Sequence, residues 1–307
     1  MIDEATGVEA LLQGTALAGR PVERAAYVGP DWAPRPPVAD DPVLFVRCEP
    51  DEIASAWRAA RSVVDRTGRW PVVTAGWAEG RPLEAELFDR VGRVADLPAP
   101  LADDELDERL GARFAQRDSF RFDHDDRLRY ELDVTARSFG SAPSLAEVGR
   151  SLGPDPGRDT LDRWLFGWEQ ALVDGGAAGG LVDDTYLKWF VPARQPCCVV
   201  LMPTATGWEA GALLDFYGAS HLDGWLTVLV SLLRRWQERW GAEIVASFGT
   251  MLELAVSSPP TEPQDLIDLA VEQCLLASCT TLLPGIHLRQ HARVLAGRST
   301  WFLHERP

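Results

Sequence analysis

The chain has 307 residues, 46% of them hydrophobic and 25% charged, which matches an ordinary globular protein and excludes a largely disordered chain. This length allows one large domain or two. The formal net charge of −16 disfavours nucleic acid and acidic membranes as partners, because binding to phosphate depends on Lys and Arg side chains, whereas a basic protein would be attracted.

Several features indicate the cytoplasm of a bacterium. Residues 1–14 are acidic and lack the basic start and apolar stretch of a secretion signal. No apolar segment reaches the ~20 residues that a membrane span needs. The five cysteines are odd in number and none lies in a CxxC motif, so they do not indicate a disulfide framework. Lys188 is the only lysine among 30 basic residues, a bias typical of GC-rich bacterial genomes.

The first half of the chain contains a β-α-β pattern. Residues 43–48 predict a buried strand, and residues 71–75 predict a second one. Between them, residues 51–67 predict a helix with Ile53 and Trp57 on one face. If the two strands pair in parallel, the crossover between them should be right-handed.

Helices are expected next at residues 83–94 and 103–116. Residues 127–136 then alternate between apolar and polar side chains, and this period of two predicts a half-exposed strand. The apolar members of the alternation are Leu128, Tyr130, Leu132 and Val134.

The next segment returns to helical spacing at residues 161–172 and ends in the glycine-rich run GGAAGG, residues 175–180. We place a domain boundary at this run. It divides the chain into an N-terminal α+β part, residues 1–180, and a C-terminal domain, residues 181–307.

The C-terminal domain predicts a mixed sheet flanked by helices. A tight turn at Gly249 joins two of its strands, and Thr261 with Gln264 forms a capping-box pattern at the start of a helix. The whole chain is therefore expected to be an α+β protein. The expected strands are 197–202, 243–248, 252–256 and 300–304, and the expected helices are 225–240, 261–279 and 287–295.

Four segments of the C-terminal part carry a resemblance to a known family. They are RRWQERWGAEIV (234–245), LELAVSSPPT (252–261), LAVEQ (269–273) and STWFL (299–303). In order and spacing they resemble the bacterial family named domain of unknown function 4253 over residues 195–307. The resemblance implies a fold but no reaction. The chain diverges where the family has further polar residues, since Thr250 stands in place of an acid.

Two histidines are candidate metal ligands. His287 and His291 are four residues apart, so both could point from one helix face toward an ion. Glu272 or His304 would be needed as a third ligand. The alternative is a solvated helix face shared with Arg289, and because no HExxH motif is present, we expect no resident metal.

The candidate catalytic residues are Glu253, Glu272, His287 and Cys279. Cys279 with a histidine could form a nucleophile–base pair, and the alternative is a buried, inert thiol. Glu253 and Glu272 could line a cleft as two acids in different environments. The alternative is a partly buried glutamate paired with an arginine such as Arg239.

Other patterns favour structural roles. The run FDHDDR, residues 122–127, could coordinate a cation, but it favours a turn at a strand edge. The chain has twelve tryptophans, of which six match helical core stripes and six lie near the ends of predicted elements. A core position is favoured for most of them, and an exposed cluster of three or more would indicate an interface. The motifs GxxxxGK[ST], GxGxxG and GxSxG are absent, so we expect no nucleotide and no other cofactor.

Two functions stay open. We expect a non-catalytic binding or interaction protein that binds a basic protein through complementary charge, with the immunity or inhibitor type as the specific hypothesis. The alternative is a hydrolase of unknown substrate with a cleft between the two halves. Neither nucleic acid nor a membrane is an expected partner, and the sequence leaves the oligomeric state open.

Overall fold

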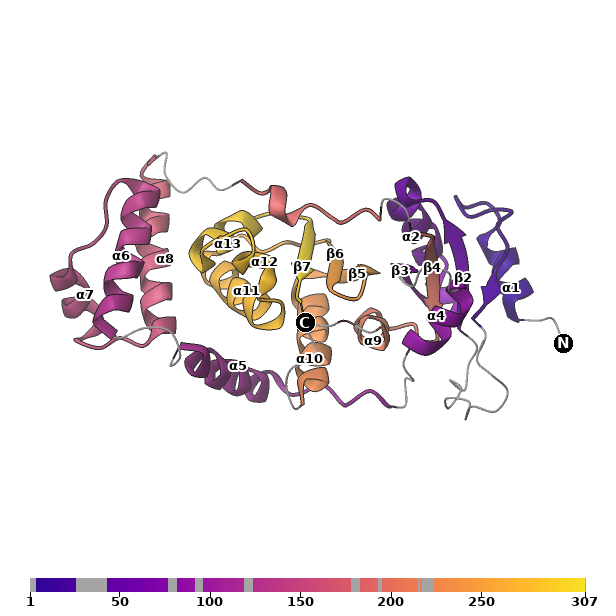
Figure 1. The fold of residues 1–307 in the computed structure, drawn as a ribbon, viewed down its shortest axis with the longest axis horizontal. Helices are drawn as coiled ribbons and strands as arrows, with labels where there is room; N and C mark the ends of the chain where they lie inside the picture. Colours follow the sequence, from indigo (N-terminus) through magenta and orange to yellow (C-terminus); the bar gives the residue numbers. More distant parts are fainter. Residues whose placement is uncertain are drawn as a thin grey trace. The chain divides into compact units, whose positions relative to one another are not determined.

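The structure is a computed structural model that describes residues 4–25, 43–76, 82–91, 96–118, 124–177, 183–192, 195–214, 216 and 224–306. It has the predicted α+β fold (Figure 1). Two compact units form, and each draws on separate stretches of the chain. The sheet unit comprises Met1–Leu101, Trp189–Ser258 and Ser299–Pro307, and the helical unit comprises Ala102–Lys188 and Pro259–Arg298.

The sheet unit is built on one sheet with the strand order β1-β2-β4-β3-β5-β6-β7. Neighbouring strands are antiparallel except β3 and β5, which are parallel. Every strand predicted outside residues 127–136 is confirmed to within one residue. The strands are β1 (Glu23–Arg24), β2 (Leu44–Cys48), β3 (Trp70–Ala75), β4 (Cys197–Met202), β5 (Ala242–Ser247), β6 (Met251–Val256) and β7 (Thr300–His304).

The predicted β-α-β unit is present, but its two strands are not neighbours. Both β2 and β3 pair antiparallel with β4, which lies between them. They are therefore parallel to each other with one strand interposed. Local sequence cannot predict this pairing, because β4 comes from residues 197–202, far along the chain.

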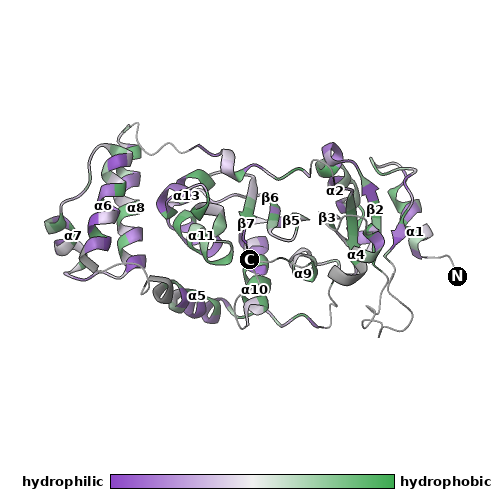
Figure 2. Cartoon of the chain, in the orientation of Figure 1, coloured by the Kyte–Doolittle hydropathy of each residue, from purple (hydrophilic) through white to green (hydrophobic). Residues whose placement is uncertain are grey.

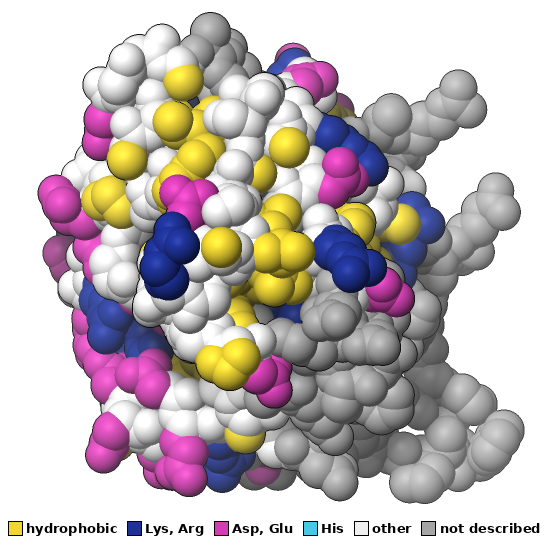
Figure 3. Space-filling view, turned by 90° about the vertical axis from the view of Figure 1, so that its left-hand side faces the viewer, with side chains coloured by type: hydrophobic (Ala, Val, Ile, Leu, Met, Phe, Trp, Pro, Cys, Tyr) yellow, Lys and Arg dark blue, Asp and Glu magenta, His cyan; other side chains and the backbone are white. Residues whose placement is uncertain are grey.

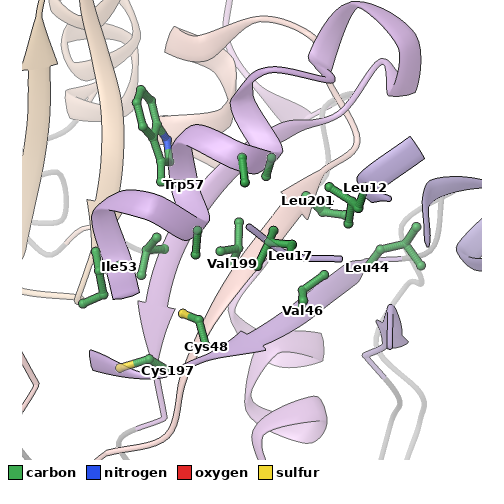
Figure 4. Close-up of a cluster of buried hydrophobic side chains, with 14 of the residues drawn as sticks. Leu12, Leu17, Leu44, Val46, Cys48, Ile53, Trp57, Cys197, Val199 and Leu201 are labelled. Atoms are coloured by element: carbon green, nitrogen blue, oxygen red, sulfur yellow. The ribbon is translucent and has the colours of Figure 1, made fainter. Parts of the chain in front are cut away.

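Helices cover both faces of the sheet. On one face, α1 and α2 pack over Leu44, Val46 and Val199 (Figure 4). On the other, α9 approaches β5 so closely that a Cβ added at Gly211 would lie 1.7 Å from Cδ1 of Ile244, so any larger residue there would have to displace the Ile244 side chain. The helices of this unit are α1 (Glu4–Leu12), α2 (Ile53–Arg61), α3 (Val64–Thr67), α4 (Leu83–Arg90), α9 (Gly207–Leu213) and α10 (Trp225–Trp240), with a 3-10 turn at Pro50–Glu52.

The helical unit has a small apolar core formed by Val148, Leu161 and Leu165. Its helix α8 contacts α5, α6, α11 and α13, and in Figure 2 both α6 and α8 carry hydrophilic as well as hydrophobic bands. The elements are α5 (Asp103–Asp118), α6 (His124–Phe139), α7 (Leu145–Leu152), α8 (Arg158–Asp174), α11 (Pro263–Leu276), α12 (Cys279–Leu282) and α13 (Leu288–Leu295), with a 3-10 turn at Thr185–Leu187.

The strand predicted at residues 127–136 is wrong, because this segment lies in α6. The buried side chains of the segment are Glu131 and Thr135, which lie four residues apart on one helical face. Both are polar, and the apolar repeat of helical period is limited to Leu128 and Leu132, which are partly buried against the core of this unit. The apolar alternation includes Tyr130, which is 45% exposed and does not mark a core face.

Three local predictions also need correction. The helix predicted at residues 51–67 is interrupted, because α2 ends at Arg61 and α3 begins at Val64. Thr261 does not cap α11; the cap is Glu262, and Pro263 occupies the first helical position, where its missing N–H costs nothing. The turn predicted at a strand edge for residues 122–127 is wrong for residues 124–127, which form the start of α6. Residues 122 and 123 and half of the GGAAGG run lie outside the described residues.

The division of the chain at residues 180 and 181 stays a prediction, and the compact units have other bounds. The chain leaves the sheet unit after Leu101, returns at Trp189, leaves again after Ser258 and returns at Ser299. Within the described residues, no helix combines the length and the apolar composition that crossing a membrane requires.

Candidate functional site

The side chains proposed from sequence are divided between the two units. Glu253 lies on β6, and His304 lies on β7 of the same sheet unit. The helical unit holds the others, which are Glu272 on α11, Cys279 at the start of α12, His287 at the N-cap of α13 and His291 within α13. Glu253 and Glu272 are buried, whereas Cys279 is partly exposed.

The two histidines of α13 do not share a ligand position. His291 is buried, its Nδ1 lies 2.8 Å from the Tyr186 hydroxyl and its Nε2 lies 3.0 Å from Oε1 of Gln273. Burial lowers the pKa of His291 to about 3, so the ring is neutral. His287 places Nε2 2.8 Å from Oε2 of Glu131. With both rings bound elsewhere, neither is placed to act as a base for Cys279.

The helical unit contains a buried cluster of charged side chains centred on Arg289. Its Nη1 lies 2.6 Å from both Oε2 of Glu131 and Oδ1 of Asp162, and its Nε donates to Oε1 of Glu169 at 3.0 Å. Its Nη2 donates to the Glu131 carbonyl oxygen and to Oγ1 of Thr135, each at 3.1 Å. All five guanidinium N–H groups therefore have acceptors.

Two further arginines balance the three carboxylates of this cluster. Arg293 donates to Oε2 of Glu169 at 2.5 Å, and Nε of Arg158 lies 3.3 Å from Oδ2 of Asp162. Three guanidinium groups thus meet three carboxylates, from α6, α8 and α13. His287 accepts a weak 3.4 Å bond from the Arg289 backbone N–H at Nδ1, so Nε2, which faces Glu131, is assigned as the nitrogen that donates to that carboxylate.

The cluster controls the protonation of its own acids. Burial opposes the ionisation of Glu131, but the bond from His287 and the charge of Arg289 outweigh it and lower the pKa of Glu131 to about 2. For Glu169 burial again opposes ionisation, and Arg289 with Arg293 lowers the pKa overall. Asp162 differs, since burial and then the neighbouring Glu131 raise its pKa. The cluster places three guanidinium groups against its three carboxyl groups, which offsets part of the cost of burying them.

The geometry of the cluster also suits a cation. One ligand atom each from Glu131, Asp162 and His287 lies within 4.8 Å of the others, which is the spacing of a metal site. However, Nη1 of Arg289 already bonds both carboxylates. A guanidinium group is therefore the cation that these residues hold, and the site serves as an internal ion pair that joins three helices.

Glu253 is the chemically unusual residue of the sheet unit. It is fully buried, its Oε1 accepts the Phe190 N–H at 2.6 Å, and its Oε2 has no hydrogen-bond partner. Phe190 in turn packs edge-on against Phe248, at 5.3 Å between ring centroids. Burial raises the pKa of Glu253 to about 8, so the side chain is a neutral acid at pH 7.

The tryptophans form cores and no exposed cluster. Trp236 and Trp240 each meet Trp301 edge-on at 5.8 Å between ring centroids, beneath the sheet. No tryptophan within the described residues is exposed, and Trp32 and Trp77 lie outside them. An aromatic interface of the kind expected from sequence therefore has no support in the described part of the chain.

Sequence reasoning missed the charge cluster, although a signal for it exists. Arg289 and Arg293 lie four residues apart, and Asp162 and Glu169 lie seven apart, so each pair shares one face of its helix. Charged residues on solvent-exposed helix faces commonly have the same spacing. Only the burial of both faces distinguishes this cluster, and burial of a polar face has no signature in hydrophobic periodicity.

Comparisons with known proteins identify part of the chain. Residues 198–304 match the family described as Domain of unknown function (DUF4253), which confirms the resemblance in the C-terminal part. The matched region begins in β4 and ends in β7, so it contributes to both compact units. Searches of curated proteins and of solved structures gave no match. The family description states no activity, so any function has to be argued from the side chains.

Proposed function

We propose that this protein acts by binding a basic protein and not by catalysing a reaction. The observation that carries the proposal is the distribution of its charges. The buried acids of the helical unit are matched by guanidinium groups, whereas acids at the start of α5 face the solvent. These exposed acids contribute to the net charge of −16.

Helix α5 presents a strongly acidic surface. Its first two turns bury Leu106 and Leu110 and expose five acids. One of these acids faces an arginine of the next turn, with 3.5 Å between Glu105 and Arg109. A basic surface would be attracted to this segment, and dissolved salt would screen the attraction. The exposed acids are Asp103, Asp104, Glu105, Asp107 and Glu108.

Exposed apolar side chains supply the second element of an interface. Tyr130, Leu145, Val173, Leu282 and Leu283 of the helical unit are each between 39% and 52% exposed. In Figure 3, hydrophobic side chains gather in the middle of the face shown, and Asp and Glu side chains lie along its left and lower edges. Lys and Arg side chains also flank the apolar centre in this view. The apolar centre suits apolar residues of a partner, and the acids at the left and lower edges suit Lys and Arg beside them. An immunity or inhibitor protein of a basic toxin would need such a surface.

Affinity capture tests the proposal. The immobilised full-length chain is exposed to a lysate of the source organism, and retained proteins are identified by mass spectrometry and passed with the chain over a sizing column. We expect a basic protein that co-elutes in a defined stoichiometry at low salt and dissociates as salt rises. Retention of no protein, together with turnover of ester, amide or phosphoester test substrates by the purified chain, would contradict it.

A hydrolase is the second candidate, and one observation favours it. Glu253 is a neutral acid at pH 7, as a general acid must be, and one of its oxygens has no partner. Against this reading, its side chain is fully buried, so a substrate would have to displace the Phe190 segment to reach it. The variant Glu253→Gln distinguishes the two functions, since it would abolish hydrolysis and leave binding to a basic protein unchanged.

A further inference from the structure

Two cysteines lie directly opposite each other in the sheet unit. Cys48 ends β2, Cys197 begins β4, and the antiparallel register pairs them, as it pairs Val46 with Val199. Residues paired in this way project from the same face of a sheet. Figure 4 shows both cysteines beside the apolar cluster on that face.

The pairing brings the two thiols close to disulfide geometry. Directly opposed residues of antiparallel strands have Cα atoms about 4.5–5.5 Å apart, within the ~4.4–6.8 Å range of disulfides. Their Cβ atoms are about 4.5–5.5 Å apart, slightly more than the ~3.5–4.5 Å that a disulfide requires. Closure therefore needs a small inward movement of the strands, and the resulting strain makes the bond easier to reduce.

No other cysteine of the chain competes for this pairing. Cys198 follows Cys197 on β4 and points to the opposite face of the sheet, as alternation along a strand requires. Cys274 and Cys279 belong to the helical unit. The register thus selects one pair out of five thiols.

We propose that Cys48 and Cys197 form a reversible dithiol–disulfide pair, which a peroxide oxidises and a thiol reductant reopens. The bond would join the end of β2 to the start of β4, next to the 3-10 turn that leads into α2. There Arg20 already links the Arg47 carbonyl oxygen, at 2.9 Å, to Glu52, at 2.7 Å. Oxidation would add a covalent bond to this polar junction.

The reaction balances with hydrogen peroxide as oxidant. The Cys197 thiolate attacks one peroxide oxygen, the O–O bond breaks, and a sulfenic acid and a hydroxide form; the hydroxide takes up the proton that the thiol released on ionising and becomes one water. The Cys48 sulfur then attacks the sulfenic sulfur, the S–S bond forms, the S–O bond breaks, and a second water leaves with the thiol proton. Two electrons pass from the two sulfurs to the peroxide.

Burial sets the rate of the first step. It raises the pKa of Cys197 to about 11 and, together with the charge of Cys197, raises the pKa of Cys48 to about 12. Cys197 is thus the easier thiol to ionise and the expected attacking group. Because only the thiolate reacts, oxidation should be slow at neutral pH and should accelerate about tenfold for each unit of pH below these values.

Peptide mapping after peroxide treatment tests the proposal. The full-length chain is incubated with hydrogen peroxide at pH 7 and pH 8, digested without reductant and analysed by mass spectrometry. We expect one cross-linked peptide pair that contains Cys48 and Cys197, that forms about ten times faster at pH 8, and that dithiothreitol dissolves. The oxidised protein should melt several degrees higher, because the bond closes a loop of about 150 residues.

Alanine variants show which cysteines form the cross-link. Cys48→Ala and Cys197→Ala should each abolish the cross-link and the gain in melting temperature, and Cys279→Ala should keep both. A cross-link between other cysteines, or stepwise oxidation of Cys48 and Cys197 to sulfinic acids without a cross-link, would overturn the proposal. The cross-linked peptide of the unmodified chain is decisive even if an alanine variant fails to fold.

Discussion

Replacing Glu253 by glutamine should stabilise the sheet unit at alkaline pH. Glutamine has the shape of a protonated glutamic acid, so its oxygen can accept the Phe190 N–H at 2.6 Å as Oε1 does, and its amide can take the place of the partnerless Oε2. The variant therefore fixes the side chain in the neutral state that burial favours.

The magnitude follows from the raised pKa. The pKa of Glu253 is about 8 in the folded protein against 4.5 for the ordinary side chain, and each unit of difference corresponds to about 1.4 kcal/mol. A group whose pKa is raised by folding contributes its full stability below pH 4.5 and loses it as the pH rises to 8. The unmodified chain should thus lose about 5 kcal/mol from this group over that interval, and Glu253→Gln should lose none of it.

Urea unfolding at pH 4.5, 7 and 8.5, followed by tryptophan fluorescence, measures the difference between the two proteins. They should be equally stable at pH 4.5, and the variant should be more stable by about 3 kcal/mol at pH 7. The matched control is Glu243→Gln on the neighbouring strand, where the carboxylate is paired with Arg61 at 2.7 Å; it should give no alkaline gain. A variant that is less stable than the unmodified chain at pH 8.5 would refute the reasoning.

Three further substitutions test the packing, each by urea unfolding. Arg289→Met should cost about 3–5 kcal/mol, because it leaves buried carboxylates uncompensated; a neutral result would mean that water reaches the cluster. His287→Ala should cost about 1–2 kcal/mol through loss of the helix cap and of the bond to Glu131, and an unchanged stability would deny both contacts. Gly211→Ala should cost about 1–3 kcal/mol, because its Cβ would collide with Ile244; a stabilised variant would place α9 further from the sheet.

The strands were predictable because the side chains that they bury are apolar. Residues 43–48 and 197–202 are short runs bounded by proline, and both became buried strands. The helix at residues 225–240 was likewise marked by an apolar stripe that ends at Gly241, where the backbone is left-handed. In these segments, local propensity and tertiary burial favour the same structure.

The wrong predictions concern segments that bury polar side chains and strands that pair with partners distant in the sequence. Glu131 and Thr135 are the fully buried side chains of their segment of α6 and are polar, and their partner Arg289 lies more than 150 residues away in the chain. The sequence of such a helical face does not show that it is buried, because its burial depends on an arginine from a distant part of the chain. The insertion of β4 between β2 and β3 depends on long-range pairing in the same way.

The candidate site was predictable only in part. Glu253 was expected to line a cleft or to be partly buried beside an arginine. Its full burial was not predictable, because the segment around Phe190 that bonds to it comes from a separate stretch of the chain. His287 was identified as chemically active, yet its partner Glu131 lies in a segment that was predicted as a strand.

The most direct test of the proposed function measures the affinity of the captured basic protein for two variants of equal net charge. One variant neutralises α5 by Asp104→Asn, Asp107→Asn and Glu108→Gln, and the matched control removes three exposed acids of the sheet unit by Asp51→Asn, Asp65→Asn and Glu238→Gln. Our account predicts that the α5 variant binds about tenfold more weakly at low salt and that the control stays within about twofold of the unmodified chain. Equal affinities for all three proteins would contradict binding through the acidic surface of α5.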